Sequence, residues 1–431
     1  MEHRMSTDEQ INHSKREAMK YVGRGGESGR RGIHPSKFLK ICFRSSSRFS
    51  CMVNILWPLV PVAIAVRYVR VDLTVLIFTL NYIAMIPCAN LIGFSGQELA
   101  RKLPRVLGIL LDITLGSVVE IVLFMILLKN ELYPVIRDAL LGSILATLLL
   151  CLGFCFIVGG IKRVEQTFNG SVSEVGYGLL LTAGLGLIIP TTYHATLKGK
   201  PMLAIIPEKL ADNVLRISRI TSVILIVSYT VYVWFNMRTH HSIYNNLFLK
   251  DETRDELQAT SLERDRLTLT ECVIALFLGI GLVSFIAVHL VEGIPFIVEA
   301  CGVSETFVGL ILIPLVEKFA EHLTALDEAW DDSMNLAMSH ILGSTVQTAI
   351  FNTSLVVLAG WASGKQMNLD FELFNIILVI LSIIVVGNFL RDQKSNYLEG
   401  VLCVSVYSII AVAAFYFPTT PMDRNPGLEF S

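Results

Sequence analysis

Two glutamates stand inside apolar stretches that are long enough to cross a membrane. Glu120 lies within VLGILLDITLGSVVEIVLF, and Glu321 lies within TFVGLILIPLVEKFAEHLTALDEAW, residues 306–330. An ionisable side chain at membrane depth is costly, so it normally faces a protein interior or a water-filled cavity and marks an ion or proton path. The alternatives are a buried neutral carboxyl group for Glu120 and an ordinary solvated acidic helix for the second stretch.

The surroundings of the two glutamates repeat. In each stretch a glycine precedes the glutamate by 12 positions, and a Gly-Ser pair follows it 22 positions later. The first copy comprises Gly108, Glu120, Gly142 and Ser143, and the second comprises Gly309, Glu321, Gly343 and Ser344. The copies are offset by 201 residues. Internal repeats of membrane segments are typical of secondary transporters, which place their ion sites where the repeats meet.

Paired carboxylates with nearby hydroxyl and amide oxygens suit a hard cation such as Ca2+, which takes six to eight oxygen ligands. A carboxylate that is either protonated or cation-bound can also exchange that cation for protons. Besides Glu120 and Glu321, the candidate ligands are Ser143, Ser344 and Gln347. His322, next to Glu321, is a candidate proton relay. For the Gly-Ser pairs, close packing of two helices is the alternative role.

Composition narrows the class of protein. Of 431 residues, 53% are hydrophobic and only 17% are charged, whereas a soluble protein averages about a quarter charged. The net charge of −2 gives no reason to expect a nucleic-acid partner. The eight cysteines show no paired metal-ligand spacing and are expected to be reduced packing residues. EHLTALDE does not supply the H-E-x-x-H motif of a metal hydrolase, so we expect no enzyme and no cofactor beyond the transported ion.

Apolar segments of about 20 residues, each long enough to span a bilayer, follow one another along the chain. We place eleven of them near 51–69, 73–95, 107–128, 134–160, 174–195, 215–236, 268–291, 305–330, 334–361, 373–390 and 398–417. Basic residues before the first span and after the second, fourth and sixth spans favour a cytosolic N-terminus. The expected fold is therefore an all-α membrane protein embedded in a lipid bilayer.

The hydrophilic stretch at 237–267 divides the spans into two groups of five. Two copies of an odd number of spans insert in opposite orientations, so we expect inverted five-helix repeats after an extra first helix. The expected regions are a disordered basic cytosolic tail at 1–50, an extra helix at 51–70, a first repeat at 71–236, a cytosolic linker at 237–267, a second repeat at 268–418 and a short tail at 419–431.

At residues 70–418 the chain resembles the CAX-type cation/proton exchangers of the Ca2+/cation antiporter superfamily. The resemblance is carried by LGFCFIVGGIKRVEQTFN (152–169), LIIPTTYHAT (187–196), ISRITSVILIVSYTVYVWFNMRTH (217–240), GVSETFVGLILIPLVEKFAEH (302–322) and NFLRDQKSNYLEGVLCVSVY (388–407). It implies eleven spans in two inverted repeats, with a hydrophilic linker between them. It also implies export of cytosolic Ca2+ into an acidic store, typically the vacuole, in exchange for protons.

The site departs from the family's Gly-Asn-Ala-x-Glu run. The first copy keeps Gly116 and Glu120 but has Ser117 in place of Asn, and the second has Glu317 and Lys318 in place of Gly-Asn. Asp112 also stands where the family usually has Asn. The comparison with the motif adds Ser117 and Glu317 to the candidate ligands, and Lys318 and Asp112 as candidate modulators. Glu120, Glu317, Glu321 and Lys318 still sum to −2, which matches a divalent ion. Alternatively, Lys318 pairs with Glu321 and occupies the cation's place, or it is displaced toward the mouth of the cavity.

We therefore expect a Ca2+/H+ antiporter of an endomembrane, vacuolar by resemblance, that works by alternating access with protonatable Glu120 and Glu321. The alternatives are exchange of Na+, K+ or Mn2+ for protons, and a homologue that no longer transports and has a regulatory role. The position of the Lys318 side chain distinguishes transport from loss of transport. An ammonium between the two glutamates would favour an altered or transport-dead protein.

Overall fold

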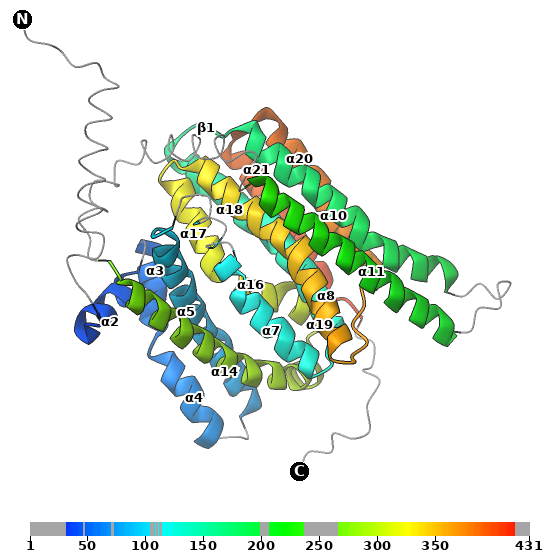
Figure 1. The fold of residues 1–431 in the computed structure, drawn as a ribbon, viewed down its shortest axis with the longest axis horizontal. Coiled ribbons are helices and arrows are strands. Elements are labelled where there is room, and N and C mark those ends of the chain that lie inside the picture. Colours follow the sequence, from blue (N-terminus) through cyan, green and yellow to red (C-terminus); the bar gives the residue numbers. More distant parts are fainter. Residues whose placement is uncertain are drawn as a thin grey trace, which may run out of the picture.

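The computed structural model describes residues 32–45, 48–69, 73–103, 108, 111, 114–198, 207–236 and 266–418 (Figure 1). Asp112 lies outside these residues. So do most of the expected N-terminal tail, the short tail at 419–431 and nearly all of the expected linker. Within them the fold is a bundle of long helices with one short two-stranded ribbon. The expectation of an all-α membrane protein is confirmed.

Nine helical segments in the described part of the chain are long and apolar enough to cross a membrane. They are Phe49–Val69, Thr74–Ala100, Tyr133–Ile161, Ser173–Leu197, Glu208–Trp234, Leu269–Cys301, Met334–Ala362, Leu373–Asp392 and Tyr397–Phe415. Each corresponds to one of the eleven expected spans. The count of eleven is not reached because the two glutamate-bearing segments, near 107–128 and 305–330, do not form single long helices in the described residues.

Both glutamate segments are interrupted. In the second, α15 (Glu305–Phe307), the π-helix η5 (Val308–Leu312) and α16 (Ile313–Glu317) end at Lys318, and α17 (Phe319–Trp330) begins after it. Lys318 has φ −89° and ψ −2°, which breaks the regular winding. In the first, α7 (Val118–Lys129) begins after Ser117, whose ψ is 0°. Broken helices are tolerated at membrane depth where they are enclosed by protein or line a cavity.

The elements reproduce the 201-residue offset of the sequence. Four elements of the first copy, α7, α8 (Tyr133–Leu145), the π-helix η2 (Ala146–Cys151) and α9 (Leu152–Lys162), have counterparts in the second. These are α17, α18 (Met334–Val346), the π-helix η6 (Gln347–Asn352) and α19 (Thr353–Ala362). The first three pairs match residue for residue. Figure 1 shows α7 and α17 leaving the middle of the molecule in opposite directions, as inverted repeats require.

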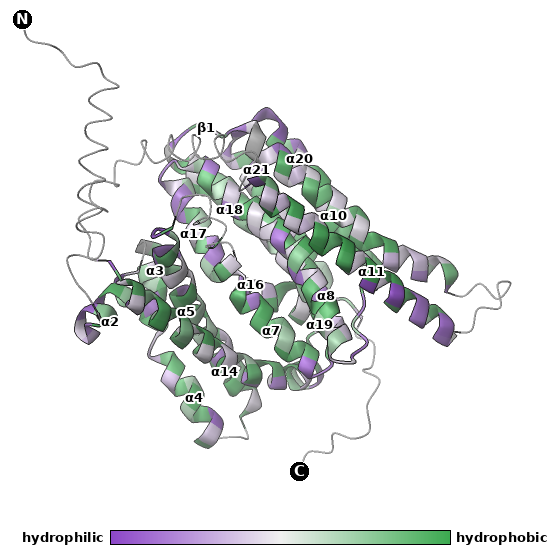
Figure 2. Ribbon diagram, viewed as in Figure 1, coloured by the Kyte–Doolittle hydropathy of each residue, from purple (hydrophilic) through white to green (hydrophobic). Residues whose placement is uncertain are grey.

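The partner helices of the two glutamates form the centre of the bundle. Tyr133–Ile161 is 67% buried and Met334–Ala362 is 83% buried, whereas Phe49–Val69 and Glu208–Trp234 are each 22% buried. The last two therefore face outward, toward lipid. Figure 2 shows mostly hydrophobic residues along the long helices and hydrophilic residues gathered toward their ends. This distribution is expected of helices that cross a bilayer.

The remaining elements enclose this centre. They are α2 (Pro35–Arg44), α3 (Arg48–Val53), η1 (Asn54–Leu56), α4 (Leu59–Val69), α5 (Thr74–Ala100), β1 (Gln166–Thr167), α10 (Gly170–Leu197), α11 (Pro207–Trp234), α14 (Leu269–Cys301), α20 (Leu373–Phe389), η7 (Leu390–Asp392), β2 (Lys394–Ser395) and α21 (Tyr397–Phe415). Strands β1 and β2 pair antiparallel and join a loop of the first copy to a loop of the second. Helix α14 begins with a capping box in which Thr268 and Glu271 bind each other's backbone amides.

Candidate functional site: a carboxylate–ammonium cluster at two helix breaks

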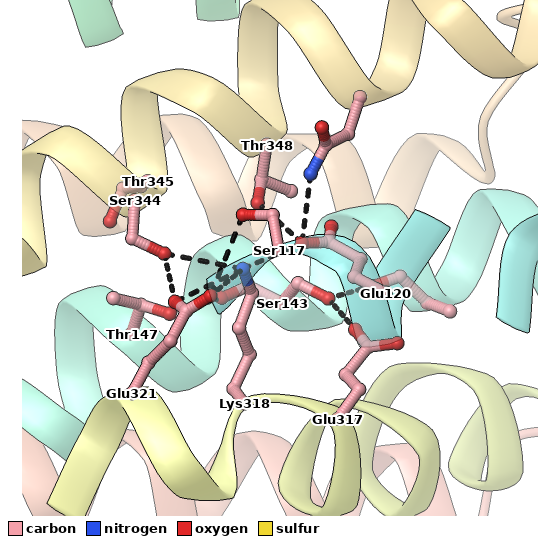
Figure 3. A network of polar contacts seen from close by, with 12 residues as sticks. Ser117, Glu120, Ser143, Thr147, Glu317, Lys318, Glu321, Ser344, Thr345 and Thr348 are labelled. Atoms are coloured by element: carbon pink, nitrogen blue, oxygen red, sulfur yellow. Dashed lines mark hydrogen bonds and ion pairs between the residues drawn. The ribbon is translucent and has the colours of Figure 1, made fainter. Parts of the chain in front are cut away.

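Each glutamate lies in the first turn of the helix that follows its break. Glu120 is the third residue of α7, and Glu321 is the third residue of α17. The first turn of a helix carries unpaired N–H groups and the positive end of the helix dipole, so it favours a negative side chain. The breaks therefore position both carboxylates at helix N-termini in the middle of the bundle (Figure 3).

The Lys318 ammonium lies between the two carboxylates. Its Nζ is 2.6 Å from Glu120 Oε2 and 3.3 Å from Glu321 Oε2. It also donates to Ser344 Oγ at 3.2 Å. The Lys318 side chain is only 1% exposed, so the alternative in which it points to a cavity mouth is wrong. The structure instead shows the arrangement in which Lys318 takes a cation's place between the glutamates.

Glu120 is held by the opposite repeat. Its Oε2 accepts hydrogen bonds from Thr348 Oγ1 at 3.0 Å and from Asn352 Nδ2 at 2.9 Å, in addition to the Lys318 ion pair. Its Oε1 has no hydrogen-bond partner among the described residues. A buried carboxylate oxygen without a donor is costly, and it leaves coordinating capacity for a positively charged ligand.

Glu321 and Glu317 each bind the serine of a Gly-Ser pair. Ser344 Oγ donates to Glu321, and Ser143 Oγ donates to Glu317. Ser117 Oγ is 3.5 Å from Glu321 Oε1, at the limit of a hydrogen bond. The second oxygen of Glu317 has no partner in the described part of the protein. Figure 3 shows Glu317 and Glu321 on opposite sides of Lys318.

Two candidate residues lie apart from the glutamate contacts. Gln347 is fully buried in η6, but neither of its amide atoms has a hydrogen-bond partner among the described residues. His322 Nε2 is 3.4 Å from Thr147 Oγ1 and makes no contact with a carboxylate that the structure describes. The break at Lys318 also separates Glu317 from Glu321. Glu317 is the last residue of α16 and Glu321 lies in the first turn of α17, so the two do not share one face of a straight helix.

Sequence reasoning missed Thr348 and Asn352, the two neutral donors to Glu120. A signal was present, because Ser344, Thr348 and Asn352 recur at intervals of four along one partner helix. The first copy has Ser143 and Thr147 at the same spacing. Residues four apart lie on one face of a helix, so Thr348 and Asn352 are expected on the same face as the candidate ligand Ser344.

A cavity that is open to solvent reaches the cluster from one side. Its lining includes Glu321, His322, Ser344 and Gln97, and at its edge His340 Nδ1 lies 2.8 Å from Glu328 Oε2. Glu120 does not line it. The side chain of Glu321 is 15% exposed and that of Glu120 is 1% exposed. From this cavity the cluster is therefore reached through Glu321 and not through Glu120.

A glycine makes room for Glu321 beside the break. A Cβ atom built at Gly116 would lie 2.9 Å from Glu321 Oε1 and 3.0 Å from its Cγ. These separations are shorter than normal van der Waals contact, so any larger residue at 116 would displace the carboxylate. The absence of a side chain at this position therefore sets where Glu321 can lie.

The cluster stabilises a single positive charge with carboxylate and hydroxyl oxygens. Among the described residues, no three His, Cys, Asp or Glu side chains lie close enough together to hold a metal ion. A multivalent cation would need Lys318 to move and the glutamates to close around it. Carboxylates can bind either a cation or a proton, so a cluster built on Glu120 and Glu321 has the groups needed to exchange one for the other.

Comparison with known proteins gives the family. The model of the family described as "Sodium/calcium exchanger protein" matches residues 73–238 and 272–416. The "Vacuolar calcium ion transporter" of Schizosaccharomyces pombe is 31% identical over 343 residues, which cover 79% of this chain and 79% of that protein. The "Ca(2+)/H(+) antiporter" of Synechocystis sp. is 31% identical over 352 residues, which cover 80% of this chain and 91% of that protein.

Solved structures show the same fold. The structure of native YfkE superposes with a TM-score of 0.70 at 25% identity and covers 85% of this chain and 100% of its own. The crystal structure of "H+/Ca2+ Exchanger CAX" superposes with a TM-score of 0.59 at 13% identity and covers 84% of this chain and 91% of its own, a likeness of fold alone. The resemblance to cation/proton exchangers that the sequence carried is confirmed. This chain belongs to the sodium/calcium exchanger protein family.

Proposed function

We propose that this protein is a secondary active antiporter that exchanges Ca2+ for protons at the Glu120–Glu321 pair. The observation that carries the proposal is the convergence of one glutamate from each repeat on a single positive charge, at the helix breaks. Ca2+/H+ exchange is the activity in the names of relatives about 30% identical to this chain. Both glutamates lie in helix first turns, where either a cation or a proton can neutralise them.

The proposed cycle begins at the cavity. A cation enters beside Glu321, the carboxylate that the cavity reaches, and draws it away from the Lys318 ammonium. Glu120 then completes the site with its free Oε1, together with hydroxyl and backbone oxygens. The two repeats rock so that the site opens on the other side, where protons displace the ion. The protonated carboxyl groups then make the return step without a bound cation.

The direction of transport follows from the expected orientation. The cavity is lined by Ala89, Gly93 and Gln97 of α5, and the basic residues Arg101 and Lys102 follow the end of that helix. Basic loops favour the cytosolic side. We propose that the cavity is cytosolic and that Ca2+ moves from the cytosol into an acidic organelle. The vacuolar names of several relatives support an endomembrane location. Mn2+, Na+ and K+ are the competing substrates.

One observation favours a second candidate, a homologue that has lost transport. The Lys318 ammonium already forms ion pairs with both glutamates, and separating the charges of a buried ion pair is costly. If Lys318 never leaves, the site cannot load a cation, and the protein would act through its fold or partners. Its position between Glu120 and Glu321 is the arrangement that this alternative requires.

The test is ion uptake into vesicles that contain the purified protein and have an acidic interior. Ca2+, Mn2+, Na+ and K+ are offered in turn, with collapse of the pH gradient by an ionophore as the control. The proposal predicts Ca2+ uptake that stops when the gradient is collapsed. Uptake of another ion alone would reassign the substrate, and no uptake of any ion by folded, inserted protein would establish the transport-dead alternative.

A further inference from the structure

Helix α2 is a short helix that lies directly before the first membrane span. It packs against the rest of the protein through Phe38, Ile41 and Cys42, which join a cluster with Phe94 and Leu99 of α5 and with Leu267 and Cys272 near the start of α14. Helix α2 therefore touches the first helices of both repeats. It does so at the end of the bundle where α5 finishes and α14 begins.

Polar bonds hold α2 in place at both of its ends. The backbone N–H of His34 donates to Glu271 Oε1 at 3.1 Å, and Thr268 Oγ1 donates to the carbonyl of Gly32 at 3.2 Å. At the other end, Asn54 Nδ2 donates to the carbonyls of Cys42 and Phe43 at 3.1 and 2.8 Å. The orientation of α2 on the bundle is therefore fixed, and so are the directions of its remaining faces.

Those remaining faces differ sharply in chemistry. At 100° per residue, Leu39 and Phe43 form an apolar stripe next to the packed face. Leu39 is 66% exposed and Phe43 is 49% exposed. Lys37, Lys40 and Arg44 form a basic stripe beyond the apolar one, and all three are exposed. The helix thus presents one face to protein, one apolar face and one cationic face.

Further exposed apolar side chains follow α2 along the chain. Met52 of α3 and Ile55 of η1, at the start of the first span, are 65% and 66% exposed. Large exposed apolar side chains beside a membrane span are satisfied by lipid, whereas in water they would be costly. A helix with an apolar face and a flanking row of lysines and arginines is the pattern of a segment that lies in the bilayer surface.

We propose that α2 is a binding site for anionic phospholipid headgroups. Leu39 and Phe43 enter the boundary between headgroups and acyl chains, and Lys37 and Lys40 contact the lipid phosphates and carboxylates above them. Basic residues near a surface of anionic lipid are attracted to it. The lipid covers the exposed side chains of Leu39 and Phe43 and the lysines beside them.

Lipid captured here acts on the exchanger's moving parts. Helix α2 is bonded to α14 and packed on α5, and α5 supplies Ala89, Gly93 and Gln97 to the cavity that reaches Glu321. Anionic lipid therefore anchors one end of both first helices at the membrane surface. The site is independent of which ion the protein transports.

The test places a photo-reactive benzophenone amino acid at position 43 of the full-length protein. The protein is reconstituted in phosphatidylcholine vesicles with and without phosphatidylserine, and the cross-linked species are identified by mass. The expected products are lipid adducts enriched in phosphatidylserine over phosphatidylcholine. In the Lys37→Gln/Lys40→Gln variant this enrichment falls roughly tenfold, while lipid adducts as such remain because the apolar stripe is intact.

A matched control replaces two exposed lysines at the opposite end of the bundle. Lys129→Gln/Lys198→Gln removes the same charge and should leave the enrichment at position 43 unchanged. Adducts to another segment of this chain or to a second copy would show that protein covers α2 and would overturn the proposal. Lipid adducts without phosphatidylserine enrichment, or enrichment that survives Lys37→Gln/Lys40→Gln, would overturn the anionic-lipid assignment.

Discussion

The charge of Lys318 should weaken Ca2+ binding, and Lys318→Asn should restore it. The ammonium lies 2.6 Å from Glu120 and 3.3 Å from Glu321, so it occupies the space that an ion between them would use. A Ca2+ ion ~5 Å from a displaced ammonium meets a repulsion of about 7 kcal/mol at an effective dielectric near 20. If the ammonium withdraws to about twice that distance, about 3 kcal/mol remains.

The expected gain from removing the charge is therefore about 3 kcal/mol, or roughly a hundredfold in Ca2+ affinity. Without a bound ion, Lys318→Asn should lower the stability of the folded protein. Two buried carboxylates lose their counter-charge, and breaking a buried ion pair by removing one partner typically costs about 3–5 kcal/mol. The variant should unfold at a lower temperature without Ca2+ and gain more thermal stability from Ca2+ than the wild-type protein does.

The assay is Ca2+ binding to purified protein at fixed pH, read together with the thermal unfolding midpoint at increasing Ca2+. It needs no transport, so it also applies if the protein is transport-dead. Lys394→Asn is the matched control, because Lys394 forms a half-exposed ion pair with Glu165 at 2.9 Å and lies outside the cluster. Equal or weaker Ca2+ affinity in Lys318→Asn would refute the reasoning that the ammonium competes for the cation's position.

Three further predictions test other parts of the proposal. Glu120→Gln and Glu321→Gln should each abolish vesicle exchange while the protein stays folded and inserted, because glutamine cannot alternate between charged and neutral forms; wild-type exchange by either would sink the assignment. Gly116→Ala should lower the exchange rate at least tenfold by displacing Glu321, whereas Gly178→Ala, with open space around it, should not; equal rates would contradict the geometry. Shortening the linker within 245–262 should preserve insertion and exchange, and loss of exchange with normal insertion would indicate a regulatory element.

The repeat in the sequence predicted more of the architecture than composition did. Glycine, glutamate and Gly-Ser at equal spacings identified two copies, and α7, α8 and η2 reappear as α17, α18 and η6 at that spacing. The lengths of the apolar runs also identified the nine helical segments, among the described residues, that are long enough to cross a membrane. These features follow from local hydrophobic pattern and residue order, which the sequence displays directly.

The breaks could not be derived from the same pattern. Ser117 and Lys318 both have backbone angles outside the regular helix, yet neither is a glycine or a proline. An unbroken helix would put Glu317 and Glu321 on one face, whereas the break at Lys318 puts them in two different helices. The position of Lys318 depends on a carboxylate from the other repeat, 198 positions away along the chain. Such a pairing is decided by packing and not by local propensity.

The repeat offset also explains why the two repeats contribute different numbers of charged residues to the cluster. At an offset of 201, Glu317 and Lys318 stand where the first copy has Gly116 and Ser117. The second repeat therefore adds one negative and one positive group, and the formal sum of the cluster stays at that of Glu120 and Glu321 alone. The positive group lies in the centre, and the negative group is bound to Ser143.

This placement determines how a cation could enter. The formal charge for a divalent ion is present, but the space between the glutamates is taken by the ammonium. Lys318 has Glu317 and its serine on one side and the cavity with Glu321 and Ser344 on the other. The side with open volume is the cavity side, so loading an ion requires Lys318 and Glu321 to separate there. Lys318 is one of the residues that depart from the family's pattern, and it is therefore also the residue that must move before the proposed site can bind a cation.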